Sequence, residues 1–191
     1  MYRGASLFAL RNGCLNQDLD KTLLLSLLDQ LNLSFKNVSG TNCLFLGAEN
    51  IEDEIRQPHV AAVVSKVATI KEVRVKLVAQ QQEMGANGGI VMDGRDIGTI
   101  VLPKAELKFF MTADPEVRAW RRLRELKELG KKVTYDEVLE NVLSRDRIDS
   151  ERAVAPLKQA EDAVVIDNSN LTMEEQYVFM LKVAKKRMEE V

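Results

Sequence analysis

Apolar positions in the first 31 residues recur with helical spacing. From Met1 to about Asn12 the pattern predicts a helix, which Asn12-Gly13 would end as a C-terminal cap. A second helix is expected from Asp20 to Leu31. Its leucines recur at spacings of three and four residues, the period that places them on one face: Leu23, Leu24, Leu27, Leu28 and Leu31.

The period then shortens to that of strands. LSFKNV (33–38) and NCLFLG (42–47) are typical of two short strands, and Ser39-Gly40 between them predicts a hairpin. Residues 49–56 are acidic and are expected to form a loop. Helical patterns return over 58–69 and 70–84 and end in the glycine-rich run 85–89.

Three apolar runs follow, at 90–92, 107–112 and 163–166, and a long helical stretch separates the last two. Asp114-Pro115 would begin that stretch as an N-cap followed by proline at the first helical position. Strands that alternate with helices favour an α/β fold with a parallel sheet. The hairpin region then is an insert in this sheet.

Charged residues follow the first of these runs directly, as Asp93-Gly94-Arg95-Asp96. Buried charges are costly unless they are paired or serve a ligand. In an open parallel sheet, ligands bind beyond the carboxyl ends of the strands. The charges therefore stand where a ligand is expected, and Asp167-Asn168-Ser169 follows the third run in the same way.

A second charged motif is SRDRIDSERAVAPLK, residues 144–158. On a helix, Arg145, Asp149 and Arg152 fall on one face. Two guanidiniums beside a carboxylate could bind a phosphate and a sugar hydroxyl together, because the planar fork of arginine makes bidentate contacts to oxyanions. The alternative is an exposed helix with ordinary ion pairs, each contributing about 0.2–0.5 kcal/mol.

The segment 115–132 is rich in arginine and lysine, and Gly130 would end its helix. Glutamates interspersed along it favour a solvated helix. A mobile basic arm over a polyphosphate ranks second. An RNA-binding stripe ranks last, because Trp120 is the one stacking aromatic there and the whole chain is 5% aromatic.

Composition limits the remaining choices. With 191 residues and 46% hydrophobic content the chain fits one domain with a real core, and its net charge of −2 gives no case for binding nucleic acid or an anionic membrane. No apolar run is long enough to span a bilayer. Cys14, Cys43 and His59 cannot assemble a four-ligand metal site, and two free thiols suit a reducing cytosol.

Taken together, MDGRDIGTIVLP (92–103), SRDRIDSERAVAPLK (144–158) and the opening YRGA (2–5) resemble the bacterial cytidylate kinases, which are nucleoside-monophosphate kinases. The resemblance extends in order over residues 1–191. It implies a cytoplasmic, monomeric enzyme of pyrimidine metabolism that transfers the γ-phosphoryl of ATP to CMP or dCMP with Mg²⁺. It also implies a phosphate-binding-loop kinase fold with a small β insert at about 33–64 and a helical lid at about 115–156.

The resemblance further assigns residues to the acceptor nucleotide. Tyr2 would line the base pocket. The cytosine edge would be read by Ser65, Arg74 and Asp96. A carboxylate at Asp96 suits this role chemically, because it accepts from the cytosine N4 amine.

Phosphate and sugar groups would be bound by further members of the same motifs. The acceptor phosphate would be held by Arg3, Arg95 and Arg152, and Arg145 and Asp149 would contact the sugar and phosphate region. Asp93 would lie near the transferred phosphoryl group and its metal, so that Asp93, Arg95 and Arg145 form the catalytic set. In the lid, a looser match points to Arg118, Arg122 and Lys131 as contacts of the donor.

One departure from the family's pattern is large. These kinases carry a phosphate-binding loop, G-x-x-x-x-G-K-[ST], whose backbone N–H groups and lysine hold the ATP phosphates. No glycine of this sequence is followed by Lys-Ser or Lys-Thr. Met1 aligns with an interior position of the family, so we expect the loop and a central strand, which would lie between 90–92 and 107–112, to be missing. The 191 residues would then be inactive with ATP, and the runner-up function is a remnant that binds CMP but not ATP.

Loss of a central strand predicts low stability. Without this strand the core would lack several buried aliphatic side chains, each of which stabilises the folded state by about 1.5–3 kcal/mol. Their summed contribution approaches the roughly 5–15 kcal/mol by which a whole domain is stable. We expect the 191 residues to unfold at low temperature when followed by circular dichroism. A cooperative transition above about 50 °C, as intact domains show, would contradict this.

Overall fold

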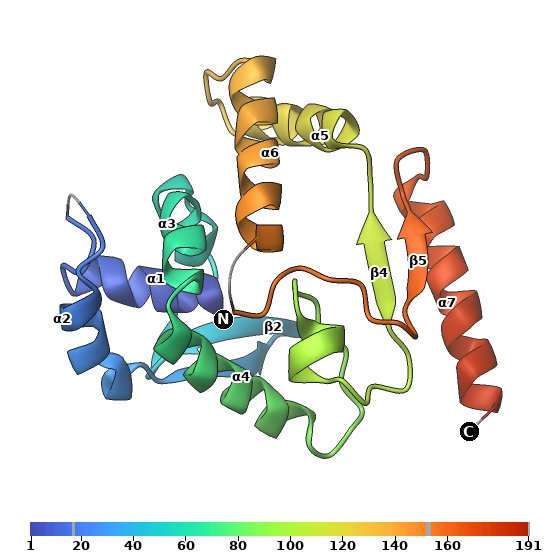
Figure 1. The fold of residues 1–191 in the computed structure, drawn as a ribbon, viewed down its shortest axis with the longest axis horizontal. Coiled ribbons are helices and arrows are strands. Elements are labelled where there is room, and N and C mark those ends of the chain that lie inside the picture. The colour runs from blue at the N-terminus through green and yellow to red at the C-terminus, as the bar shows by residue number, and fades with distance from the viewer. Residues whose placement is uncertain (17, 152–153, 191) are drawn as a thin grey trace. The chain divides into compact units, whose positions relative to one another are not determined.

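The computed structural model describes residues 1–16, 18–151 and 154–190. It divides into two compact units, Met1–Gly88 and Gly89–Val191 (Figure 1). The division falls in the glycine-rich run at 85–89, where the sequence predicts a break. No described helix is both long and apolar enough to cross a membrane.

The first unit packs four helices and a small sheet around one core. Its elements are α1 (Tyr2–Arg11), α2 (Lys21–Ser26), β1 (Leu33–Val38), β2 (Thr41–Leu46), β3 (Glu49–Asn50), α3 (Pro58–Ala68) and α4 (Lys71–Gly85), with 3₁₀ turns η1 (Leu28–Gln30) and η2 (Glu54–Arg56). The core gathers apolar side chains from α1, the sheet, α3 and α4, among them Leu7, Leu44, Val60 and Leu77. These side chains are at most 1% exposed, so α1 is fixed on the sheet and on α3.

The predicted hairpin is confirmed. β1 and β2 pair antiparallel from Leu33 opposite Leu46 to Val38 opposite Thr41. Ser39 and Gly40 both have positive φ, as a tight two-residue hairpin turn requires. The acidic segment after β2 is more regular than the predicted loop, because β3 adds to β2 and η2 follows it.

The second predicted helix is shorter than its leucine pattern indicates. Asp20 caps α2 by accepting a hydrogen bond from the Leu23 amide, and α2 ends at Ser26. A 3₁₀ turn then carries the chain to Leu31, which is buried. The leucine spacing thus marks the buried positions Leu24 and Leu31, but Leu23 is 36% exposed and the α-helix is shorter than predicted.

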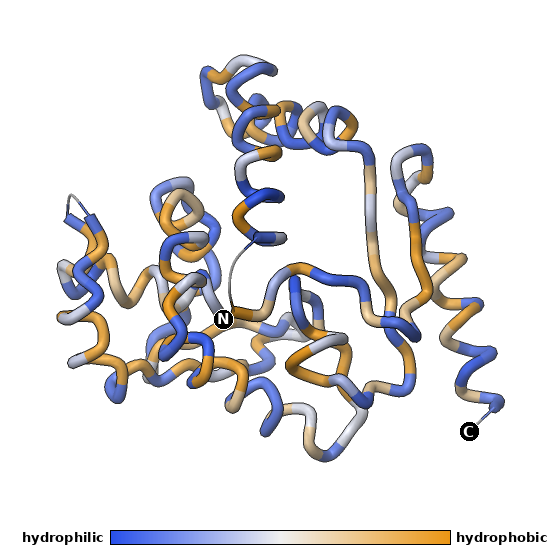
Figure 2. Tube along the Cα trace, viewed as in Figure 1, coloured by the Kyte–Doolittle hydropathy of each residue, from blue (hydrophilic) through white to orange (hydrophobic). Residues whose placement is uncertain are grey.

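The second unit contains a parallel pair of strands and three long helices. Its elements are the π-helical turn η3 (Ile97–Val101), β4 (Phe109–Thr112), α5 (Pro115–Glu128), α6 (Tyr135–Glu151), β5 (Val164–Asp167) and α7 (Met173–Glu189). β4 and β5 pair in parallel, from Phe109 opposite Val164 to Thr112 opposite Asp167, and Figure 2 shows them as mainly apolar segments. This confirms two of the three predicted strands and the parallel α/β class.

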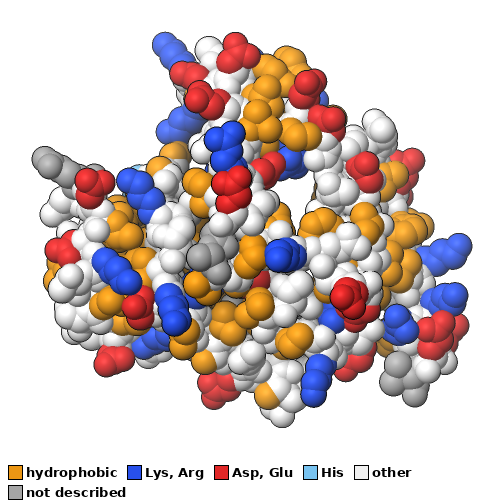
Figure 3. All heavy atoms as spheres, viewed as in Figure 1, with side chains coloured by type: hydrophobic (Ala, Val, Ile, Leu, Met, Phe, Trp, Pro, Cys, Tyr) orange, Lys and Arg blue, Asp and Glu red, His pale blue; other side chains and the backbone are white. Residues whose placement is uncertain are grey.

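The predicted strand at 90–92 is wrong. The structure has no strand there, and Val91 is 99% exposed. A strand is stabilised by pairing with a neighbour, and none of the described strands pairs with this segment. Apolar side chains also remain at the surface over β5 and α7, as Figure 3 shows, with Val165 47% and Val178 57% exposed.

Helices α5 and α6 pack on each other around a small core of their own. Ala119 and Leu123 of α5 are buried against Val138 of α6. The Trp120 ring stacks on Tyr135 at 4.5 Å between centroids. Asp114 caps α5 and Gly130, with φ of 71°, follows its end, as the sequence predicts.

The carboxyl ends of β4 and β5 are tied to α5 by polar contacts. Ser169 Oγ accepts from the Asp114 amide at 2.8 Å. Arg121 donates to the carbonyl of Asn168 at 2.6 Å and to its side-chain oxygen at 3.1 Å. The turn after β5 is therefore held against the start of α5.

A substitution at Gly4 tests how closely α1 packs on the hairpin. A Cβ at this position would come within 2.8 Å of a methyl carbon of both Leu33 and Leu44. Inside a helix, Gly→Ala normally stabilises by about 0.5–1 kcal/mol, but here we expect Gly4→Ala to destabilise the protein by about 1 kcal/mol through overpacking. Urea unfolding measures the difference. A free energy of unfolding equal to or above that of the natural sequence would show that the leucines move aside freely.

Candidate functional site

Tyr2 and Arg3 lie in the first turn of α1, next to the buried Gly4. Arg3 Nη1 donates to the carbonyl of Ile55 at 2.9 Å, so its side chain is oriented along η2. Ser6 Oγ donates to the Tyr2 carbonyl at 2.8 Å and fastens the start of the helix. The YRGA motif thus places an aromatic ring and a guanidinium at the beginning of a helix that the core holds rigidly.

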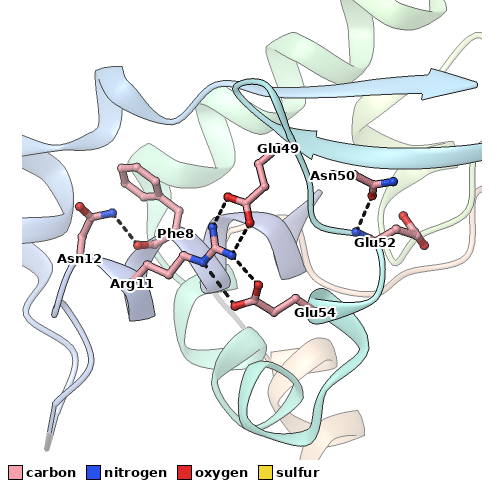
Figure 4. A network of polar contacts seen from close by, with 7 residues as sticks. All are labelled: Phe8, Arg11, Asn12, Glu49, Asn50, Glu52 and Glu54. Carbon is pink, nitrogen blue, oxygen red and sulfur yellow. Dashed lines mark hydrogen bonds and ion pairs between the residues drawn. The ribbon is translucent and has the colours of Figure 1, made fainter. Parts of the chain in front are cut away.

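An ion-pair network at the other end of α1 supports this arrangement (Figure 4). The Arg11 guanidinium lies between Glu49 of β3 and Glu54 of η2, with nitrogen–oxygen distances of 2.6 and 2.8 Å to Glu49 and 2.5 and 3.3 Å to Glu54. Hydrogen bonds to both carboxylates raise the pKa of Arg11. Because η2 is attached to α1 in this way, the Ile55 carbonyl stays within reach of Arg3.

Arg74 of α4 is 2% exposed, which is rare for an arginine. Its guanidinium carbon lies 5.2 Å from the centroid of the Tyr2 ring, and Nη1 donates to the Ala68 carbonyl at 3.2 Å. Ser65 stands half-buried on the neighbouring helix α3. The structure therefore brings Tyr2 and Arg74 together, as a shared pocket would require.

In the second unit, the charged segment after 90–92 leads into η3. Asp93 and Arg95 are exposed, whereas Asp96 is 5% exposed. The Asp96 carbonyl accepts from the amides of Ile100 at 2.9 Å and Val101 at 3.2 Å, so the π-helical turn fixes the backbone of Asp96. This geometry buries the carboxylate of Asp96 and leaves that of Asp93 in solvent.

Arg95 reaches from this segment to α6. Its Nε lies 3.1 Å from Asp149 Oδ2, and the side chains of Arg95 and Asp149 are 52% and 13% exposed. Arg145 lies one helical turn before Asp149 and is half-buried, and its Nε has no hydrogen-bond partner among the described residues. Burial lowers the pKa of Arg145, and the nearby charges of Arg95 and Arg122 lower it further.

Arg95, Arg122 and Arg145 are hereafter called the arginine cluster, because the charges of Arg95 and Arg122 both act on Arg145. Three guanidiniums crowded together repel each other, and Asp149 and Asp146 offset only part of this repulsion at Arg145. An anion of high charge density would relieve it. That the cluster binds a phosphate stays a prediction.

The lid residues lie in and just beyond α5. Arg118 forms a bidentate pair with Asp146 of α6, at 2.9 and 2.6 Å, and Arg122 pairs with Glu125 at 2.7 Å. Lys131 is exposed immediately after Gly130. That these residues contact a donor nucleotide stays a prediction.

The structure brings the predicted residues together in two groups. Tyr2, Arg3, Ser65 and Arg74 belong to the first unit, and Asp93, Arg95, Asp96, Arg145 and Asp149 to the second. Arg152 lies outside the described residues. Within these groups, Arg74 lies against Tyr2 and Arg95 pairs with Asp149. The assignment of all these residues to one nucleotide stays a prediction.

Among the described residues, no group of three or more histidine, cysteine, aspartate or glutamate side chains is arranged to hold a metal ion. Mg²⁺ commonly takes one or two carboxylates and fills its other positions with water and phosphate oxygens. The exposed carboxylate of Asp93, two residues before Arg95, fits this requirement.

Comparisons with known proteins decide the family. The sequence model of the family described as "Cytidylate kinase" matches residues 1–186. The cytidylate kinase of Flavobacterium johnsoniae is 50% identical over 186 residues, which are 96% of this chain and 81% of that protein. The chain belongs to the cytidylate kinase family.

Two further cytidylate kinases show how widely this similarity extends. That of Parabacteroides distasonis is 49% identical over 185 residues, 95% of this chain and 81% of its own length. That of Caldicellulosiruptor saccharolyticus is 47% identical over 175 residues, 92% of this chain and 76% of its own length. Cytidylate kinases are nucleoside-monophosphate kinases, so the resemblance drawn from the three motifs is confirmed.

The sequence did not single out Arg11 or Asp146 as supports of this kinase site. Arg11 stands in the last turn of α1 and its partners stand in the acidic segment 49–56. The sequence shows that these residues have opposite charges. It does not show that they pair, because Arg11 is 38 residues from Glu49 and 43 residues from Glu54. Asp146 adjoins Arg145 and resembled one more charge on a solvated helix.

Arg145→Met tests whether the cytidylate kinase site holds a cation at a cost in stability. An unpartnered buried donor costs about 1–3 kcal/mol, so we expect the ligand-free variant to unfold about 2–4 °C higher, equivalent to about 1 kcal/mol. Inorganic phosphate should raise the unfolding temperature of the natural sequence but not that of the variant. Differential scanning fluorimetry measures both.

Arg147→Met, an exposed change on the same helix, is the control. It should alter neither the unfolding temperature nor its response to phosphate. A variant at Arg145 that is less stable than the natural sequence would refute the idea that this cation is held under strain.

Proposed function

We propose that the protein transfers the γ-phosphoryl group of ATP to CMP or dCMP, giving ADP and CDP or dCDP. Membership of the cytidylate kinase family over residues 1–186 is the observation that carries this proposal. The arginine cluster beside a buried Asp96 supports it, because it combines groups for a phosphate with a carboxylate for a base.

The proposed roles follow the chemistry of the side chains. Ser65, Arg74 and Asp96 read the cytosine edge beside Tyr2, where the Asp96 carboxylate accepts from the N4 amine. Arg3, Arg95 and Arg152 hold the acceptor phosphate, and Arg145 and Asp149 bind at the sugar and phosphate. These contacts place the acceptor oxygen in line with the phosphoryl group that it attacks.

Phosphoryl transfer needs positioning and cations more than covalent help from the protein. Charge spreads over the phosphoryl oxygens in the transition state, and Arg95 and Arg145 stabilise it. When bound with ATP, Mg²⁺ neutralises oxygens of the terminal phosphates, and Asp93 would hold it. Arg118, Arg122 and Lys131 belong to a lid over 115–156 that excludes water, which would otherwise accept the phosphoryl group.

A second candidate function has its own observation. The 191 residues contain no G-x-x-x-x-G-K-[ST] motif, which in such kinases holds the donor phosphates. On this basis the 191 residues by themselves bind CMP and transfer no phosphoryl group. Calorimetric binding of CMP without formation of CDP from ATP would favour this candidate. Formation of CDP would refute it, and absence of CMP binding would refute both candidates.

Asp96→Asn tests base reading directly. The change keeps the size of the side chain but replaces a pure acceptor by an amide that can donate to the O4 of uracil. We expect the affinity for CMP to fall about tenfold, the effect of about 1.4 kcal/mol, while the affinity for UMP stays equal or rises. Isothermal titration calorimetry with both nucleotides measures this.

Asp136→Asn is the matched control, because it removes an exposed carboxylate of α6. It should change the affinity for neither CMP nor UMP. An equal loss of CMP and UMP affinity in Asp96→Asn would mean that Asp96 does not read the base.

A further inference from the structure

The contacts of Arg118 differ in kind from those of the arginine cluster. Nη1 and Nη2 each donate to one oxygen of Asp146, at 2.9 and 2.6 Å, and Nε donates to the carbonyl of Ala113 at 3.0 Å. All three nitrogens of the guanidinium are therefore engaged by the protein itself. Asp146 raises the pKa of Arg118, whereas the pKa of Arg145 is lowered. Arg118 is thus satisfied in the ligand-free protein and Arg145 is not.

Arg118 joins the end of β4, helix α5 and helix α6. Ala113 directly follows β4, and Arg118 itself stands in the second turn of α5. Asp146 lies on α6 between two predicted site residues, immediately after Arg145 and three positions before Asp149. A single guanidinium therefore connects the carboxyl end of β4 to the segment of α6 that carries the phosphate-binding side chains.

The apolar packing of α5 on α6 lies toward the other end of α6. It involves Tyr135, Val138, Leu139 and Val142, within the first eight residues of the helix. Asp146 is one turn beyond Val142, and Arg95 contacts Asp149 about one turn farther on. The apolar packing therefore holds the first half of α6, and polar contacts add to the restraint on its second half, among them the pairs Arg118–Asp146 and Arg95–Asp149. The pair of Arg118 with Asp146 is bidentate.

We propose that the Arg118–Asp146 pair positions the acceptor-phosphate site by fixing the rotation of α6, so that Arg145 and Asp149 are presented beside Arg95. The proposal rests on the proposed function of that site. Arg118 then acts through Asp146 rather than by touching a nucleotide, which is a different role from the donor contact that the resemblance implies. Asp146 has a second effect, because its carboxylate offsets part of the repulsion on Arg145.

Geometry makes this pair specific to arginine. A guanidinium binds both oxygens of a carboxylate in one plane and still has Nε for a third acceptor. A lysine would keep the charge but bind only as a point charge, so it could not fix the direction of α6. Arg118→Lys therefore separates positioning from charge.

The experiment compares CMP with cytidine, which lacks the phosphate. Calorimetry on the 191-residue protein gives both affinities for Asp146→Asn, Arg118→Lys and the conservative Asp146→Glu. We expect Asp146→Asn and Arg118→Lys to lower the affinity for CMP about tenfold, because small displacements of a binding group carry such costs. The affinity for cytidine should change by less than about twofold. Asp146→Glu, which keeps the carboxylate, should recover most of the CMP affinity.

Glu140→Gln and Arg124→Lys are matched controls. Each repeats a charge or shape change at an exposed position of the same two helices, and each should leave both affinities unchanged. Parallel loss of CMP and cytidine in Asp146→Asn would overturn the proposal, since general destabilisation affects both ligands. If Asp146→Asn does not fold, as judged by its unfolding transition, Arg118→Lys decides by the same criterion.

A double variant tests whether Asp146 acts through Arg145. In an Arg145→Gln background, Asp146→Asn should lower the affinity for CMP by less than about twofold, because the effects of two residues that act through each other are not additive. A full tenfold loss in that background would overturn the proposal.

Inorganic phosphate separates the failure of this inference from the failure of the proposed function. A natural sequence that binds phosphate but not CMP would refute the proposed function, and Asp146→Asn should then still weaken phosphate about tenfold. Unchanged phosphate binding in that variant would overturn the positioning role. A natural sequence that binds neither ligand would overturn both.

Discussion

Pairing between guanidinium and carboxylate groups is the interaction on which the candidate site depends in both units. Arg11 joins α1 to β3 and η2 in the first unit and thereby keeps the Ile55 carbonyl beside Arg3. Arg118 joins α5 to α6 in the second. In each case one arginine holds elements of the backbone together, and a neighbouring arginine is predicted to bind the ligand. The planar fork suits the first task and the permanent charge suits the second.

This difference in role between arginines that hold the backbone and arginines predicted to bind a ligand explains the burial of Arg145. Burying Arg145 without a full set of partners lowers stability, and proteins accept such costs mainly where a ligand will supply the missing contacts. Arg74 is more deeply buried, but it lies against the Tyr2 ring and a backbone carbonyl that stabilise it. Arg74 of the predicted base-reading group is thus stabilised by its surroundings, whereas Nε of Arg145, in the predicted phosphate-binding group, has no hydrogen-bond partner among the described residues.

Local patterns predicted most of the fold, and the failures share a physical cause. The hairpin turn at Ser39-Gly40, the caps at Asp20 and Asp114 and the strands β4 and β5 all depend on near neighbours or on a strong apolar run. The segment 90–92 is equally apolar, yet a strand exists only when another strand pairs with it. Ion pairs such as Arg11–Glu54 and Arg118–Asp146 join residues 43 and 28 positions apart, so the sequence shows the charges but not the partners. The motifs predict which residues form the site, and the structure adds the ion pairs that surround these residues.

The pairs Arg95–Asp149 and Arg118–Asp146 of α6 differ in geometry. Arg95 meets Asp149 through one contact at 3.1 Å and is half exposed. Arg95 is open to solvent on one side of this pair, whereas Asp149 is 13% exposed. The bidentate pair of Arg118 has two shorter contacts and an added carbonyl bond. In the proposed function the single pair adjoins the phosphate, and the bidentate pair helps to hold the helix that carries Arg145 and Asp149.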